Sequence, residues 1–174
     1  MSKTAPTGTF RATPEKIVSR IEALAWCVAQ RGAGRRIVLA NGAFDLLHVG
    51  HIRYLEGARA HGDALLVAVN SDASVRLSKG DDRPIQSERE RAEMVAALAA
   101  VDRVFLFGDR TVEQVLRDML PAVHAKGTDY SAETVPERTI AEQIGASTVI
   151  TGDPKDHATT DTIQTILSRF GPRR

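Results

Sequence analysis

The chain has 174 residues, 43% hydrophobic and 26% charged, a composition that suits one well-packed domain and is short for two. Its 23 basic and 22 acidic residues give a net charge of +1, which excludes a broad basic surface for nucleic acid. Cys27 is the only cysteine, so intrachain disulfides and cysteine-based metal clusters are excluded. No apolar run reaches membrane-spanning length. We therefore expect a soluble, cytoplasmic protein with no membrane or nucleic-acid partner, in which any anion site is local.

The chain is predicted to begin with a flexible tail over 1–13, followed by a single domain over 14–174. The tail is polar and lacks the apolar core of a signal peptide. An N-cap residue followed by proline at 13–14 favours a helix start, and Gly32 marks a stop. This predicts an extra N-terminal helix over 13–32 with a structural role. Its apolar residues at helical spacing are Ile17, Ile21, Leu24, Ala25 and Val28.

Five apolar runs are predicted to be the strands of a parallel sheet. They lie at 36–41, 63–70, 104–107, 122–126 and 147–151, and helical segments are expected between them. Strands that alternate with helices are typical of an α/β fold with a doubly wound, five-stranded parallel sheet. In such a sheet ligands bind beyond the carboxyl ends of the strands. Residues at or just past these ends are His48, Asn70, Lys126 and Thr151.

The first of these strands ends at a glycine turn that two histidines follow. Gly42 lets the backbone approach a ligand closely, and His48 and His51 fall on one face of the first turn of the next helix. Gly50 places no side chain between them. A helix start after a strand presents backbone N–H groups and a positive dipole end, which favour bound phosphate. The stretch over 36–51 therefore predicts a phosphate site.

Three other stretches carry polar or charged residues where the sheet would hold a ligand. The loop over 79–85 has two cations, and Arg91 follows on the next helix; taken alone, such a loop can be an ordinary solvated connection. The stretch over 126–130 combines a cation, a glycine and a carboxylate, and can equally be a capped turn. The hydroxyl-rich stretch over 156–161 opens the last helix and could either cap it or cradle phosphate.

In order and spacing these motifs resemble the cytidylyltransferase-like nucleotidyltransferases, over about residues 36–170 of the chain. The His-x-Gly-His motif is specific for that superfamily, and two further motifs favour its heptose 1-phosphate adenylyltransferase branch. The matching segments are Asn41-Gly-Ala-Phe-Asp45, His48-Val-Gly-His51, Val69-Asn-Ser-Asp72, Lys79-Gly80, Arg83-Pro84, Val101-Asp102, Lys126-Gly-Thr-Asp-Tyr130 and Thr159-Thr160. One departure is Ala158, where the family usually has a hydroxyl residue.

The resemblance implies in-line attack of a sugar 1-phosphate on the α-phosphorus of ATP, with release of pyrophosphate. It implies catalytic roles for His48, His51 and Lys126, with Mg²⁺ as the expected counter-ion and no protein metal site. The implied nucleotide and phosphate contacts are Asn41, Gly42, Ala43, Phe44, Gly50, Lys79, Arg91, Thr159 and Thr160. The implied sugar phosphate contacts are Asp45, Asn70, Asp72, Arg83 and Asp129. Asp45 could orient either the sugar or a histidine.

Two alternatives stay open at the level of the sequence. One is a nucleotidyltransferase for another phosphate, such as glycerol 3-phosphate or phosphoethanolamine with CTP, or flavin mononucleotide with ATP. The other is a non-catalytic nucleotide-binding regulator, whose signature would be loss of His48, His51 or Lys126; all three are present. The sugar kinase domain of the family's bifunctional members is absent from the sequence. We therefore expect a separate kinase upstream. We also expect a homodimer.

Overall fold

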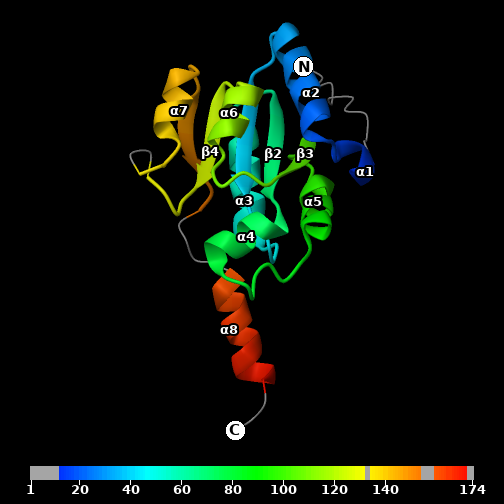
Figure 1. Ribbon diagram of the computed structural model, residues 1–174, viewed down its shortest axis with the longest axis vertical. Coiled ribbons are helices and arrows are strands. Elements are labelled where there is room, and N and C mark those ends of the chain that lie inside the picture. Colours follow the sequence, from blue (N-terminus) through cyan, green and yellow to red (C-terminus); the bar gives the residue numbers. More distant parts are fainter. Residues whose placement is uncertain (1–11, 132–133, 154–158, 172–174) are drawn as a thin grey trace, which may run out of the picture.

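The computed structural model describes residues 12–131, 134–153 and 159–171. Its centre is a sheet of five parallel strands in the spatial order β3-β2-β1-β4-β5 (Figure 1). The strands are β1 (Ile37–Gly42), β2 (Ala64–Asn70), β3 (Arg103–Phe107), β4 (Val123–Gly127) and β5 (Ser147–Thr151). The predicted doubly wound parallel sheet is confirmed, and each predicted strand coincides with an observed one to within two residues at either end.

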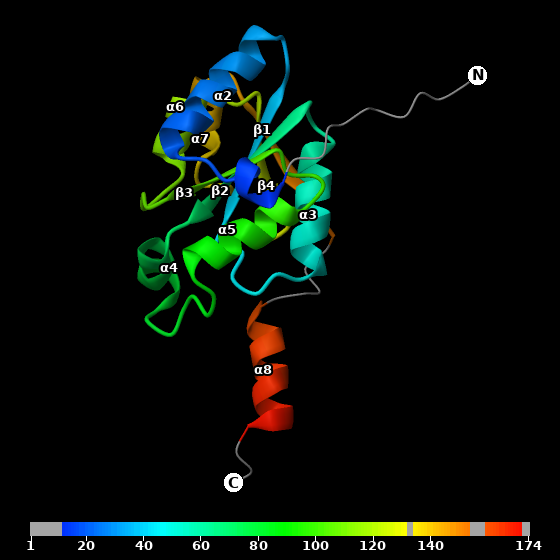
Figure 2. The same cartoon turned by 90° about the vertical axis from the view of Figure 1, so that its right-hand side faces the viewer.

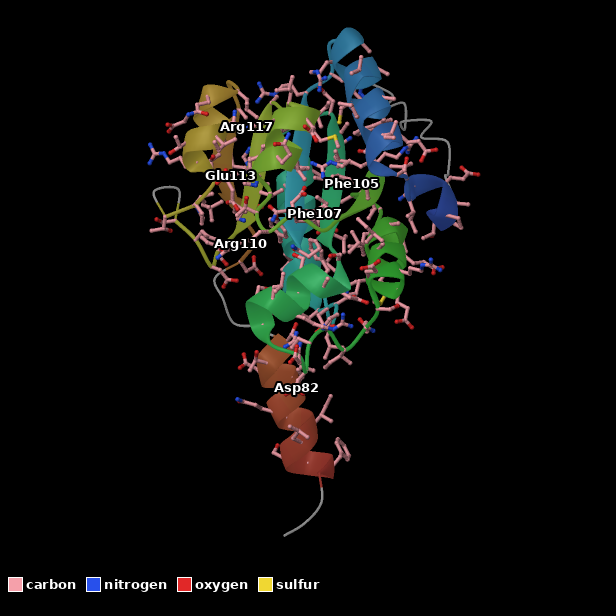
Figure 3. All side chains as sticks on the ribbon, viewed as in Figure 1. Asp82, Phe105, Phe107, Arg110, Glu113 and Arg117 are labelled. Atoms are coloured by element: carbon pink, nitrogen blue, oxygen red, sulfur yellow. The ribbon has the colours of Figure 1, made fainter. Side chains whose placement is uncertain are left out.

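Helices cover both faces of the sheet because side chains alternate along each strand (Figure 1, Figure 2). Val38 and Ala40 pack under α3 (Val49–Arg59) and α5 (Glu88–Ala97). Ile37 and Leu39 face the opposite core under α2 (Arg20–Gly32) and α6 (Glu113–Met119), with α7 (Arg138–Gln143) beside them. Phe105 and Phe107, labelled in Figure 3, point from β3 into this second core. The near-continuous apolar runs therefore reflect burial on both faces.

The N-terminal helical segment differs from the prediction because it is two helices rather than one. The short α1 (Thr13–Lys16) ends at Ile17, which forms a parallel bridge to Val104 at the edge of the sheet. A new helix, α2, then begins at Ser19, whose side chain and that of Glu22 form a reciprocal capping box. The capping box and the edge bridge override the helical periodicity that ran across residues 17–19.

The buried face of α2 also differs from the predicted one. Ile21 and Val28 are 80% and 56% exposed, whereas Ala23 and Cys27 are fully buried against the sheet. Small residues one turn apart let the helix approach the strands closely. They therefore face the sheet in place of the larger apolar residues. Trp26 lies at the edge of this core, under the guanidinium of Arg103 at 5.7 Å.

The strand order fixes where a ligand can enter. β1 is the first strand in the chain, yet it lies between β2 on one side and β4 on the other. The chain therefore winds outward in both directions from β1, and the crevice at the carboxyl ends of β1 and β4 is the topological switch point of the sheet. Asn41 is the last but one residue of β1 and Lys126 holds the same place in β4, so both reach this crevice.

Two helices flank the crevice. α4 (Asp72–Lys79) follows β2 directly, and α8 (Thr159–Phe170) projects away from the sheet in both views (Figure 1, Figure 2). The prediction for 156–161 is only partly covered, because residues 156–158 lie outside the described ranges, as do residues 1–11 of the predicted tail. No helix in the described ranges is long and apolar enough to cross a membrane.

Candidate active site

A cavity of about 700 Å³ opens at the carboxyl ends of β1 and β4, within the size range of small-molecule sites. The loops after β1, β2, β4 and β5 and the start of α8 line it. It brings together all the predicted site residues except Asp72 and Arg91. These are His48, His51, Lys126, Asn41, Gly42, Ala43, Phe44, Gly50, Lys79, Thr159, Thr160, Asp45, Asn70, Arg83 and Asp129.

The two histidines are arranged by the first turn of α3. His48 has extended backbone angles at the N-cap, and its backbone N–H donates to Nδ1 of His51 over 3.3 Å. The two imidazole rings stack with centroids 3.9 Å apart. Because Nδ1 of His51 accepts this hydrogen bond, the proton of a neutral ring sits on Nε2. His51 can therefore donate a hydrogen bond to a phosphate oxygen without carrying a charge.

The surroundings of His51 keep it neutral. Burial is the main cause that lowers its pKa to about 4, and the charges of His48 and Lys79 lower it further. Asp129 opposes this shift in part. At neutral pH the ring is thus an uncharged donor whose strength does not depend on its own titration.

A strained residue shapes the loop before the histidines. Phe44 has a φ of +50°, in the left-handed region, and its buried ring lies 5.3 Å from the His51 ring and 6.4 Å from Tyr54. A Cβ at Gly42 would meet the Phe44 ring at 3.2 Å, so glycine makes room for this packing. The hydroxyl of Tyr54 donates to the carbonyl of Ala125 on β4, which joins α3 to the sheet below the cavity.

Asp45 holds a neighbouring loop in place. Its carboxylate is 2% exposed and accepts hydrogen bonds from Nε of Arg83 at 2.6 Å and from the backbone N–H groups of Ile85 and Gln86 at 2.8 and 3.0 Å. Burial alone would raise the pKa of this carboxyl, but these hydrogen bonds and the Arg83 charge outweigh burial and lower the pKa. The sequence left open a sugar or a histidine as the partner of Asp45; the structure gives it the 83–86 loop.

Arg91 and Asp72 lie elsewhere than the sequence implied, because they form a buried clamp behind the cavity wall. The guanidinium of Arg91 is fully buried and donates to the carbonyls of Gln86, Asn70 and Ala43, and to the Asp72 carboxylate at 2.8 Å. These carbonyls belong to the loop after β1, the last residue of β2 and the loop before α5. The predicted ligand contacts of Arg91 and Asp72 give way to a role in holding three loops together.

His124 is a supporting residue that the sequence analysis missed. It lies fully buried on β4, with Nε2 3.2 Å from Oδ1 of Asn41. Burial, and to a lesser extent the charge of Lys126, lower its pKa to about 3, so the ring is neutral. A neutral ring with its proton on Nε2 donates to Asn41 and orients that side chain at the cavity. An isolated histidine inside an apolar strand gave no signal for this pairing.

Lys126 reaches the cavity from β4, the strand that pairs with β1. Its side chain is 8% exposed, and Nζ lies 3.4 Å from Oε2 of Glu137 and 4.8 Å from the centre of the Tyr130 ring. Glu137 was also missed by the sequence analysis, because nothing in a polar stretch 11 residues downstream indicates that it folds back. The cavity further includes Tyr54, Gly127, Thr128, Tyr130, Thr151, Gly152 and Asp153. Thr151 was indicated by the sequence, because it lies at the carboxyl end of a predicted strand.

Taken together, the groups that line the cavity are of the kind that can bind a polyphosphate. His48 and His51 stand at the N-terminus of α3 with Lys79 nearby, Lys126 faces them from β4, and α8 begins at the same cavity. Positive groups on two sides can neutralise charge on a phosphate held between them. A parallel sheet with such a site at its switch point is typical of nucleotide-binding α/β proteins, and the His-x-Gly-His motif in the cavity points to nucleotidyltransferases among them.

The comparisons with known proteins agree with this class. The family model described as "Cytidylyltransferase-like" matches residues 39–169, and the chain belongs to this family of nucleotidyltransferases. Proteins called "Bifunctional protein HldE" are similar to it: that of Geobacter sulfurreducens is 39% identical over 88% of this chain, and that of Bradyrhizobium sp. is 43% identical over 87%. The chain spans about a third of the length of these relatives, 32% and 31% respectively.

A solved structure shares the fold. The crystal structure of the lipopolysaccharide core biosynthesis protein from Thermoplasma volcanium superposes with a TM-score of 0.60 at 27% sequence identity. The match covers 70% of this chain and all of that chain. The two proteins therefore share the fold over most of this chain.

Proposed function

We propose that this protein is an adenylyltransferase that moves AMP from ATP to a heptose 1-phosphate, giving ADP-heptose and pyrophosphate for lipopolysaccharide core or related surface-glycan synthesis. The observation that carries the proposal is the stacked pair His48 and His51, which faces Lys126 across one cavity at the switch point. The heptose-branch motifs around Lys79, Arg83 and Lys126 all line that cavity, which supports the choice of substrate.

In the proposed reaction, a phosphate oxygen of the sugar attacks the α-phosphorus of ATP in line. A new phosphorus–oxygen bond forms as the bond to the bridging oxygen breaks, and pyrophosphate leaves with the electron pair. His48 and His51 donate hydrogen bonds to the α- and β-phosphate oxygens, while Lys79 and Lys126 neutralise the charge. Arg83, whose Nη2 is buried and without a hydrogen-bond partner in the described structure, is available to the sugar phosphate.

Mg²⁺ is proposed as the cofactor that screens the charge of the triphosphate. The described residues contain no group of three or more His, Cys, Asp or Glu that could hold a metal ion. The donor set of the cavity fits an ion that arrives on the nucleotide's own phosphate oxygens, with Asp153 within the same cavity as a candidate protein ligand.

The test is a matrix of pyrophosphate release. ATP and CTP are each combined with the α and β anomers of heptose 1-phosphate, glycerol 3-phosphate, phosphoethanolamine and flavin mononucleotide. The proposal predicts turnover with ATP and a heptose 1-phosphate, at least about 100-fold above every other pair in kcat/KM. Preference for another acceptor would identify a different nucleotidyltransferase, and nucleotide binding without turnover on any acceptor would indicate a regulator.

We also propose a separate sugar kinase, which must phosphorylate the sugar before this step. The proposed acceptor already carries a phosphate, so supplying it requires a phosphoryl transfer to the hydroxyl of the sugar's first carbon.

A homodimer is a further proposal. Sedimentation velocity measures the oligomeric state directly, and a single species at the 18.9 kDa of the chain would contradict the dimer.

A further inference from the structure

Glu137 places a buried negative charge directly behind the cavity wall. Its side chain is 9% exposed, and Oε2 lies 3.4 Å from Nζ of Lys126. Oε2 has no hydrogen-bond partner among the described residues. A buried carboxylate is costly unless a counter-ion compensates it, so the Lys126 ammonium is the group that makes this burial tolerable.

Helix capping does not account for this side chain. Glu137 occupies the N-cap position of α7, yet its side chain makes no capping hydrogen bond, and only its carbonyl bonds to the amide of Ala141. The carboxylate is instead turned toward the end of β4. Its charge also acts on Tyr130, the residue whose ring contacts Lys126. Burial is the main cause that raises the pKa of Tyr130, and the charges of Glu137 and Asp129 raise it further.

The contact with Glu137 holds the Lys126 ammonium without using all of its hydrogen-bond donors. A distance of 3.4 Å is longer than the roughly 2.7–2.9 Å of a strong charge-assisted hydrogen bond. The Tyr130 ring supports the ammonium from a second side, at 4.8 Å, and Lys126 still lines the cavity. The ammonium therefore has a defined place and keeps donor capacity for a phosphate.

We propose that Glu137 is a positioning residue for the adenylyl transfer, which holds the Lys126 ammonium at the cavity edge and offsets its charge before reaction. The inference rests on the proposed function. An offset ammonium attracts the bound triphosphate weakly, whereas it interacts more strongly as extra negative charge develops on the transferring phosphate. The pair thus favours the transition state over the ground state, which raises kcat rather than affinity.

The variant Glu137→Gln tests this, because it keeps the size of the side chain and removes the charge. We expect kcat to fall at least about tenfold while the dissociation constant for ATP falls about threefold, since the ammonium then binds the ground state fully. A merely structural role would instead weaken ATP binding together with kcat. Glu142→Gln is the matched control, because Glu142 lies on the same helix and pairs only with exposed Arg138 in the structure as described.

A double-mutant cycle with Lys126→Met tests whether Glu137 affects kcat through Lys126. If Glu137 acts through Lys126, adding Glu137→Gln to Lys126→Met changes kcat by less than about twofold. Independent, multiplying losses would overturn the proposal. So would Glu137→Gln with the kcat of the wild-type protein.

Binding of inorganic pyrophosphate, measured by calorimetry, separates this inference from the proposed function. If the wild-type protein turns over no acceptor, the proposed function fails, yet tighter pyrophosphate binding by Glu137→Gln still supports the charge offset, and unchanged or weaker binding overturns it. If Glu137→Gln does not fold, Glu137→Asp replaces it, because it keeps the charge and moves it away from Nζ. A lower kcat at unchanged ATP affinity then supports the positioning role, and an unchanged kcat refutes it.

Discussion

The two walls of the cavity are ordered in different ways. The first wall, formed by the loops after β1 and β2 and the 80–87 segment, is fixed by the buried side chains of Asp45 and Arg91, which together make seven hydrogen bonds. On the second wall, formed by the segments after β4 and β5, Lys126 is held by one carboxylate at 3.4 Å and one aromatic ring.

This difference has a physical meaning. The Asp45 carboxylate and the Arg91 guanidinium are each held by three or more hydrogen bonds, which leaves the backbone that carries the histidines few alternative arrangements. A single ion pair with a long contact leaves the ammonium able to exchange one anion for another. The first wall thus supplies preorganised geometry, and the second supplies charge that responds to the ligand. Each wall can be disturbed separately.

The largest effect is expected from breaking the first wall at Arg91. Arg91→Met leaves three carbonyls and the Asp72 carboxylate without their donor, and should lower the free energy of unfolding by about 3–5 kcal/mol. Urea unfolding measures this loss. Arg89→Met, on the exposed side of the same helix, is the control and should change the stability by less than about 0.5 kcal/mol. Equal stability of both variants would refute the clamp.

His51→Ala tests the chemistry that the first wall carries. Removing one preorganised donor to the transferring phosphate should lower kcat by about 100- to 1000-fold while the folded structure is kept. Steady-state kinetics and thermal unfolding are measured together, with His61→Ala, an exposed residue just after the end of α3, as the control. A normal kcat with lost thermal stability would assign His51 to packing alone.

Lys126→Ala tests the second wall. Loss of the ammonium should abolish most turnover, at least about 30-fold in kcat, because it neutralises charge at a partly desolvated site. Lys126→Arg should restore only part of it, because a planar fork does not replace a compact charge beside Glu137. Kinetics of Lys126→Ala within about threefold of the wild-type protein would leave the lysine without a catalytic role.

Acid should weaken the protein through the imidazoles of His51, which is partly buried, and His124, which is fully buried. The pKa values of His51 and His124 are lowered from 6.5 to about 4 and about 3 in the folded state. Below pH 6.5 the unfolded chain therefore binds protons that the folded protein does not, and stability falls with falling pH. Each histidine should contribute up to about 1.4 kcal/mol per pH unit between pH 6.5 and 5. Urea unfolding across this range measures the slope, and His124→Asn should reduce it by about half; an unchanged slope would contradict this account.

The smallest effect is expected from Asp129→Asn, which tests sugar recognition on the second wall. The KM for the sugar phosphate should rise about three- to tenfold, while ATP binding stays within about twofold, because the carboxylate is assigned to the sugar alone. Asp81→Asn, in an exposed loop, is the control. Weaker ATP binding with an unchanged KM for the sugar phosphate would move Asp129 to the nucleotide.

The sequence by itself determined the sheet and most of the cavity. Apolar runs long enough for one strand each fixed the five strands, and polar residues at their carboxyl ends marked His48, Asn70, Lys126 and Thr151 as cavity residues. These predictions succeed because strand burial and the helix N-terminus are local properties, which neighbouring residues decide. The roles of the cavity residues in binding and catalysis stay predictions.

Only the tertiary structure decided which polar groups face each other. Arg91 looked like a phosphate ligand in the sequence, but burial and four hydrogen bonds turn it into a clamp. Glu137 and His124 gave no sequence signal, because their partners Lys126 and Asn41 come from other segments of the chain. The same holds for α2, where close packing selected Ala23 and Cys27 over larger apolar residues. Pairing and packing depend on distances between segments remote in sequence, and local patterns carry no information about those distances.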